Sequence, residues 1–535
     1  MKNQKLLLWG LAILSGLLLS IPYLVPHTGF LALIAFIPLL CLDRIADILK
    51  VKHVWIWHYS TFVLWNALST FWVCNATLGG GLFAIFANAL QMSVIFAVFR
   101  FSKKKFNGIL PYILLLSLWI GWERAYFDAE ISWPWLVLGN SFAGSIRSIQ
   151  WYEYTGTLGG SLWIWLCNLS IFGLMVSLSD GTWQKLNKKA HIAIPIGITL
   201  LFCLPFIISQ FIWNAHTSVE DNEKMDILIV QPNIDPYHKF EYLTREQQDS
   251  IALAQIKPEL EKRKDDKPLL VLTPETFTND VYITCGNISS RSAERFQELA
   301  QDYPGTSFLV GASSYDIIYQ KLKPSHTARK WGNGWIESHN SALCIDAQKK
   351  QIFHKNKLVV GVEYMPWPSF FSKVDDMLGG VIGRCRGQGY VSGFNIDNTR
   401  FGTAICYESI YGEYYTGYIK DGAKFMTIIT NDAWWGNTPG YRQHLRYASL
   451  RAIETRRDIA RCANTGISAI INSRGEIKSQ THWWKQENLK GQVSLNDEET
   501  FFVSHGDITG RLIYFLGWML LLSLGVQTLK TRKRN

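Results

Sequence analysis

Long apolar runs alternate with short polar segments over the first 213 residues, and one more apolar run lies near the end of the chain. A helix needs roughly 20 mostly apolar residues to cross the hydrocarbon core of a bilayer. Eight runs meet this requirement, at about 5–24, 28–47, 54–75, 79–99, 109–128, 158–179, 191–213 and 508–529. The pattern predicts a multi-pass α-helical membrane domain at 1–214 with seven transmembrane helices, and an eighth transmembrane helix with a basic tail at 506–535.

Residues 215–505 follow a different pattern, in which short β-branched runs alternate with polar helical stretches. This alternation is typical of layered α/β domains. A helix is predicted at about 441–458. Strands are predicted at Ile227–Val230, Leu269–Leu272, Ser307–Val310, Ser341–Ile345, Thr403–Ile405, Met426–Ile429 and Ser468–Ile471. We therefore expect an α/β sandwich domain inserted between the seventh and eighth spans.

The basic residues of the membrane domain lie in every second loop. Lys and Arg precede the first run and follow the second, fourth, sixth and last runs, at positions 2–5, 44–52, 100–105, 185–189 and 530–534. Loops rich in Lys and Arg stay in the cytoplasm. Both termini are therefore predicted to be cytoplasmic, and the 215–505 domain is predicted to lie outside.

The composition excludes some classes of partner and site. The chain has 53 Lys and Arg against 43 Asp and Glu, a net charge of +10, but the basic residues form short blocks between apolar runs. Nucleic acid is therefore not an expected partner. The nine Cys show no spacing typical of a metal site or a disulfide framework. Whether Cys285 and Cys385 pair in an oxidising compartment stays open.

Three polar residues stand directly after predicted or possible strands. Glu275 follows 271–274, Lys355 follows 351–354 and Cys406 follows 402–405. In α/β sheets, catalytic groups tend to lie just beyond the carboxyl ends of strands. Taken singly, each residue also has a structural explanation, as a solvated Glu, a surface Lys or a small core Cys.

Together the three residues carry a family resemblance. Their order, with Cys406-Tyr407-Glu408 and the segment 430–436, resembles the nitrilase superfamily of Glu-Lys-Cys enzymes. The membrane spans on either side make the chain similar to the apolipoprotein N-acyltransferase family. Further matching segments are 230–234, 340–341, 358–359, 363–364, 443–444, 451–452 and 464–468. The chain departs from the family at Thr273, at 360–362 and at Phe240, where the family has Trp, Pro-Phe-Gly and Trp respectively.

The resemblance implies a nitrilase-like αββα sandwich and an acyltransferase that uses no cofactor and no metal. Glu275 would be the base, Lys355 the cation that stabilises thiolate and oxyanion, and Cys406 the nucleophile. Residues that would contact substrate or support the trio are Glu363, Tyr407, Glu408, Phe240, Trp434 and Trp435.

The implied reaction moves a fatty acyl chain from a glycerophospholipid, typically phosphatidylethanolamine, through a Cys406 thioester. The acceptor would be the N-terminal α-amine of S-diacylglyceryl-cysteine in an apolipoprotein, which completes lipoprotein maturation. The partners would be the phospholipid, the diacylated apolipoprotein and the membrane. We expect a monomer in the bacterial inner membrane with its catalytic domain on the periplasmic side.

Two other functions are compatible with the same fold. A membrane-anchored nitrilase-type amidohydrolase would send the thioester to water. A non-catalytic lipid-binding scaffold would keep the fold alone, and the intact trio of Glu275, Lys355 and Cys406 argues against it.

Overall fold

The computed structural model describes residues 2–216, 223–239, 242–264, 266–369, 371 and 383–534. The chain divides into two compact units, Met1–His216 with His505–Asn535, and Thr217–Ser504. The first unit is helical and the second is built on two β-sheets.

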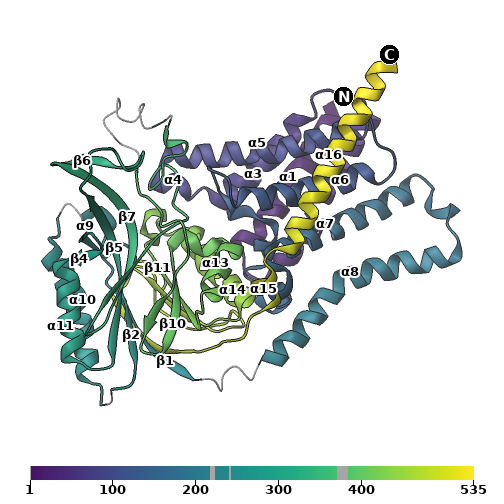
Figure 1. The fold of residues 1–535 in the computed structure, drawn as a ribbon. Coiled ribbons are helices and arrows are strands. Elements are labelled where there is room, and N and C mark those ends of the chain that lie inside the picture. Colours follow the sequence, from purple (N-terminus) through teal and green to yellow (C-terminus); the bar gives the residue numbers. More distant parts are fainter. Residues whose placement is uncertain are drawn as a thin grey trace. The chain divides into compact units, whose positions relative to one another are not determined.

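The helices of the first unit include α1, α3, α5, α6 and α16, which run side by side (Figure 1). The longer helices are α1 (Lys2–Leu24), α2 (Ile37–Ile48), α3 (Trp55–Thr70), α5 (Leu78–Ser102), α6 (Leu110–Tyr126), α7 (Tyr152–Ser179), α8 (Lys188–Ala215) and α16 (Ile508–Arg534). Stacked rings of Phe36 and Trp165, 4.2 Å apart, lie in the core. Many large apolar side chains on the outside are exposed, among them Phe83 and Phe515, as expected of helices in lipid.

Six helical segments among the described residues are long and apolar enough to cross a membrane: 3–24, 29–48, 78–102, 152–179, 188–215 and 508–531. The predicted spans at 54–75 and 109–128 contain the shorter helices α3 and α6, with 16 and 17 residues. At about 1.5 Å per residue these helices fall short of the roughly 30 Å hydrocarbon core. The 54–75 run is not one helix because the chain turns at Phe71 and Trp72 before α4 (Val73–Ala76).

Among the described residues, the first sheet of the second unit has nine strands, of which β1, β2, β5 and β3 pair in parallel. Its strands are β1 (Lys224–Gln231), β2 (Leu269–Leu272), β3 (Thr278–Thr284), β4 (Asn287–Ser289), β5 (Thr306–Ile318), β6 (Arg329–Trp331), β7 (Gly334–Ile345), β8 (Lys350–His354) and β15 (Glu487–Ser494).

In the part of the chain that the structure describes, the second sheet has six strands, with β10, β11 and β12 parallel at its centre. Its strands are β9 (Phe394–Ile396), β10 (Thr399–Ile405), β11 (Phe425–Thr430), β12 (Ile459–Ala463), β13 (Ala469–Ile471) and β14 (Ile477–Gln480). Every residue of β11 is buried, as is typical of a strand covered on both faces.

The two sheets pack face to face and helices cover their outer faces (Figure 1). One core joins side chains of both sheets, such as Leu309 and Phe353 with Ile428. A second core joins the first sheet to α10 (Arg245–Glu261) and α11 (Arg291–Asp302). The second sheet is covered by α13 (Gly412–Lys420) and α14 (Pro439–Thr455). The predicted fold, a helical membrane part with an αββα sandwich, is confirmed.

The seven predicted strands are all present, and the helix predicted at 441–458 is α14. Short connecting elements are α9 (Pro236–Lys239) and α15 (Phe501–His505). Cys285 and Cys385, whose pairing the spacing left open, are both free thiols.

Truncation of the central strand β11 tests the importance of the core between the sheets. Ile428 is fully buried there, so Ile428→Ala should cost about 2–5 kcal/mol and lower the apparent Tm by at least about 4 °C. Thermal unfolding of the full chain in detergent measures this. Ile477→Ala, on β14 with 38% of the side chain exposed, is the control, and an equal shift in both variants would contradict the assignment of the core.

Candidate active site

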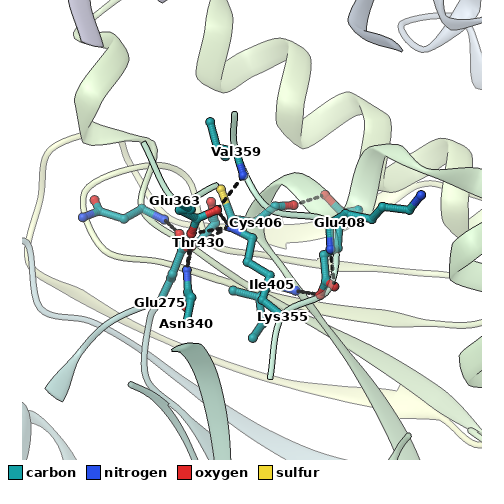
Figure 2. A network of polar contacts seen from close by, with 12 residues as sticks. Glu275, Asn340, Lys355, Val359, Glu363, Ile405, Cys406, Glu408 and Thr430 are labelled. Carbon is teal, nitrogen blue, oxygen red and sulfur yellow. Dashed lines mark hydrogen bonds and ion pairs between the residues drawn. The ribbon is translucent and has the colours of Figure 1, made fainter. Parts of the chain in front are cut away.

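The three residues singled out from the sequence converge at the carboxyl ends of strands from both sheets. Glu275 lies three residues beyond β2, Lys355 follows β8 directly, and Cys406 follows β10 directly. Figure 2 shows their side chains turned toward one another. Glu275 and Lys355 are buried, whereas Cys406 is half-buried. The αββα fold therefore brings together residues that are up to 131 positions apart in the sequence.

Lys355 is paired with two carboxylates. Its Nζ lies 3.2 Å from Glu275 Oε1 and 2.9 Å from the carboxylate of Glu363. Burial alone would lower the pKa of the ammonium, but the charges of Glu275 and Glu363 outweigh it and raise that pKa well above its ordinary value. Lys355 therefore stays a cation at the centre of the site.

Asn340 on β7 also forms hydrogen bonds with both of these carboxylates. Its Nδ2 donates to Glu275 Oε1 at 2.7 Å and to Glu363 Oε1 at 2.6 Å (Figure 2). The remaining carboxylate oxygens accept backbone N–H groups, that of Asn431 on Glu275 at 3.1 Å and that of Val359 on Glu363 at 2.8 Å. In the sequence, Asn340 was noted only as part of a segment that resembles the family. The spacing of residues along a strand does not show that its side-chain amide contacts two glutamates.

Cys406 occupies a strained turn. Its φ is +50°, in the left-handed region that non-glycine residues rarely adopt, and the chain passes there from β10 into the 3₁₀ turn Cys406–Ile410. Burial and the negative charge of Glu275 raise the pKa of the thiol well above its ordinary value, although Lys355 opposes the shift. Near neutral pH Cys406 is therefore a protonated thiol, which would need a base to become a nucleophile.

Glu408 stabilises the turn at Cys406 through hydrogen bonds. Its buried carboxylate accepts the backbone N–H of Ile405 at 2.9 Å and that of Asn356 at 2.7 Å, and the hydroxyl of Tyr414 donates to it at 2.7 Å. Burial raises the pKa of Glu408, and these hydrogen bonds oppose the shift. The sequence predicted that Glu408 supports Lys355 and a substrate amine; the observed contacts tie the strand end before Cys406 to the residue after Lys355.

A buried polar network that the sequence did not predict lies behind Cys406. His444 Nε2 is 3.2 Å from the Cys406 carbonyl oxygen and 2.9 Å from Ser409 Oγ, and its Nδ1 is 2.9 Å from Asp432 Oδ1. Arg461 donates to Asp432 Oδ2 at 2.6 Å. Burial would raise the pKa of Asp432, but the charges of Arg461 and His444 hold it below its usual range.

A second buried lysine also lies close to the trio. Lys239, the last residue of α9, donates to the backbone carbonyl of Thr276, the residue after Glu275. Burial lowers the pKa of its ammonium to about 7, with Glu275 opposing the shift. The sequence gave no signal for this residue, because a Lys in a short polar segment is usually at the surface.

The aromatic candidates lie in different surroundings. Tyr407 is buried and packs edge-on against Tyr411, with ring centres 5.3 Å apart. Trp434 is 37% exposed, while the ring of Trp435 lies 5.6 Å from that of His444. Phe240, the remaining candidate, lies outside the described residues.

Comparison with known proteins matches both parts of the chain. Residues 15–170 match the family model described as "Apolipoprotein N-acyltransferase N-terminal domain", and residues 270–501 match "Carbon-nitrogen hydrolase". A relative from Chlorobaculum tepidum named "Apolipoprotein N-acyltransferase" is 26% identical, over 97% of this chain and 96% of its own. One of the same name from Geobacter metallireducens is 25% identical, over 93% and 91%.

The solved structures that are similar include Saccharomyces cerevisiae Nit3, described as a member of the nitrilase superfamily. It has 14% sequence identity and a TM-score of 0.38, and the match covers 51% of this chain and 90% of that one.

Removing one of the two carboxylates that pair with Lys355 should change the pH range in which the enzyme is active. Glu363→Gln removes a negative charge that raises the lysine pKa, so the variant loses the ammonium at a lower pH than the wild type. We expect the alkaline limb of the kcat/KM profile to move down by about one pH unit or more.

The control for this variant is Glu259→Gln on α10, where the carboxylate pairs with Lys262 at 3.0 Å outside the site. Its pH profile should match that of the wild type. An unmoved alkaline limb in Glu363→Gln would show that the protonation of Lys355 does not limit activity.

Proposed function

The chain belongs to the apolipoprotein N-acyltransferase family, and we propose that its Cys406 carries the acyl chain from a glycerophospholipid to the N-terminal amine of an apolipoprotein. The observation that carries this proposal is the convergence of Glu275, Lys355 and Cys406 in an αββα sandwich on the same chain as apolar helices long enough to cross a membrane. Such a trio can form and release a thioester.

In the first half-reaction, the Cys406 sulfur attacks the carbonyl carbon of an acyl ester while Glu275 takes the thiol proton. The ester C–O bond then breaks, and Glu275 returns the proton to the departing lysophospholipid oxygen. Lys355 and the backbone N–H of Tyr407 stabilise the oxyanion that forms between these steps. Loss of one such donor typically costs about 10²–10³ in rate.

In the second half-reaction, the α-amine of the diacylated N-terminal cysteine attacks the thioester carbon. Glu275 takes a proton from the amine, the C–S bond breaks, and the proton returns to Cys406. One acyl chain and one proton have then moved, and no cofactor is required.

Phosphatidylethanolamine is the donor we propose, and the enzyme acts as a monomer.

The membrane location follows from the substrates. Each buried acyl CH₂ contributes about 0.8 kcal/mol, so both lipids stay in the bilayer and the enzyme must meet them there. The family and the apolar helices make the chain a bacterial membrane protein. We propose that residues 217–504 are periplasmic and both termini cytoplasmic, because Lys and Arg fill alternate loops.

The other predicted residues have supporting roles in this proposal. Glu363 keeps Lys355 charged, and Glu408 fixes the Cys406 turn. Trp434, which is partly exposed, and Trp435 line the path of the acyl chain. Phe240 would contact the acyl donor, by resemblance alone.

The covalent intermediate provides the direct test. Full-length protein incubated with phosphatidylethanolamine should gain one fatty-acyl mass on Cys406, detected by intact-protein mass spectrometry. The adduct should disappear when a diacylated lipopeptide is added, as the lipopeptide gains the same chain. Cys406→Ala should form no adduct, while Cys285→Ala, which removes an exposed thiol, should behave like the wild type.

The time course without lipopeptide separates this function from hydrolysis. An adduct that decays equally fast with and without lipopeptide would identify water as the acceptor and favour an amidohydrolase. No adduct in the wild type would contradict the phospholipid donor or the nucleophile.

Substitution of the base should separate two effects of Glu275. Glu275→Gln should slow acyl transfer by about 10²–10⁴, because no base takes the thiol proton. The same change removes a negative charge that raises the thiol pKa, so alkylation of Cys406 by iodoacetamide should begin at a lower pH. A loss of transfer below about tenfold would contradict the role of Glu275 as base.

A further inference from the structure

Three potential metal ligands gather at one place in the first sheet, on residues that the mechanism does not use. Asp316 on β5, His339 on β7 and His354 at the end of β8 each offer one ligand atom, and these atoms lie within 4.8 Å of one another. His339 Nε2 is 3.5 Å from Asp316 Oδ2. The two imidazole rings have centres 4.1 Å apart.

Strand alternation places this cluster on the opposite face of the sheet from the trio. Ser314 pairs with His339, and Ser341 pairs with His354, so these side chains share a face with Asp316. Asn340 and Lys355, one position further along each chain segment, point to the other face, where they contact Glu275. The cluster is therefore separate from the acyl-transfer site.

The hydrogen bonds of His339 leave a ring nitrogen directed at the cluster. Its Nδ1 is 2.7 Å from the carbonyl oxygen of Arg386, which can only accept, so Nδ1 carries a proton and Nε2 is the ring nitrogen left to bind an ion. His339 is 4% exposed, and its Nε2 has no hydrogen-bond partner among the described residues. Asp316 Oδ1 is likewise buried without such a partner in the described part of the chain.

A second ligand is oriented in a comparable way. His354 Nδ1 lies 2.7 Å from Ser341 Oγ, which in turn is 2.7 Å from Ser314 Oγ. Metal-binding histidines usually have their second ring nitrogen held by a carboxylate, a backbone carbonyl or water, and the Ser341 hydroxyl takes that place for His354.

Charge and access also suit a cation. A metal-bound ligand set of two imidazoles and one carboxylate carries a net charge of −1. The Asp316 side chain is 32% exposed, which leaves a route for entry. The positive charge near the cluster, Arg386, is paired with Glu337 at 2.6 Å. The cation therefore does not meet an unpaired guanidinium.

We propose that Asp316, His339 and His354 bind one Zn²⁺ ion, with water as the fourth ligand. Two nitrogens and one oxygen form a ligand set that Zn²⁺ accepts in proteins. The ion would link β5, β7 and β8 on the face behind the trio. This site is additional to the proposed acyl transfer and does not depend on it.

To bind one ion, the ligand atoms must move slightly closer together. Bonds of about 2.0–2.2 Å at tetrahedral angles place ligand atoms about 3.4 Å apart, which the His339–Asp316 separation of 3.5 Å already meets. The longest separation, up to 4.8 Å, must shorten by about 1.4 Å. Splaying of the stacked rings and rotation of the half-exposed Asp316 can supply this.

Zinc binding is best measured in an untagged, full-length Cys406→Ala protein, because a free thiol in the active site would itself bind zinc. After chelation and dialysis, titration against a chromophoric zinc chelator should give one tight site per chain. His339→Ala and, as a gentler change at a half-exposed position, Asp316→Asn should weaken binding at least about tenfold. His482→Ala removes an exposed His paired with Glu487 and should leave binding unchanged.

X-ray absorption of the loaded protein identifies the ligands. We expect nitrogen and oxygen neighbours at about 2.0–2.1 Å and no sulfur near 2.3 Å. The proposal is overturned if no tight site appears, if sulfur is bound, or if His339→Ala and Asp316→Asn bind zinc as tightly as His482→Ala does. Thermal unfolding without zinc shows that each variant is folded, so weak binding cannot be attributed to a lost fold.

Discussion

The site depends on one buried cation shared by two carboxylates. Lys355 is 1% exposed, and burying an ammonium without partners would cost several kcal/mol and favour its neutral form. Glu275 and Glu363 reverse that preference, and Asn340 satisfies an oxygen on each of them. Each of these charged side chains is stabilised by the others, so the position of each is fixed before substrate binds. This preorganisation allows a fixed charge to stabilise an oxyanion.

Cys406 is also held in place by its surroundings, in this case by hydrogen bonds to backbone groups on either side of the turn. A left-handed Cys406 costs about 1–3 kcal/mol, and such strain persists only where surrounding contacts overdetermine it. Glu408 fixes the N–H group before the turn, and His444 and Ser409 contact the carbonyl of Cys406 itself. These contacts keep the sulfur beside Lys355 although the turn is unfavourable by itself.

The sequence predicted this arrangement only where local patterns carry the information. Apolar runs and β-branched runs located the helices and all seven expected strands, and residues at strand ends identified Glu275, Lys355 and Cys406. Asn340 and Asp432 entered only as parts of matching segments and Arg461 was missed, because a local pattern does not show which side chains they contact. Hydropathy also could not show that α3 stops at Thr70, since the residues of the following turn are equally apolar.

The alternation of side chains along β7 and β8 explains why two sites can lie so close without mixing. His339 and His354 face one side of the sheet, while Asn340 and Lys355, their immediate neighbours, face the other. A slip of one residue in either strand would exchange these sets and would place a histidine where the cation must be. The register of β7 on β5, paired from Phe308↔Ile345 to Ile318↔Trp335, resists such a slip over its whole length. The antiparallel pairing of β5, β7 and β8 thus also decides which face carries acyl-transfer chemistry and which presents imidazoles.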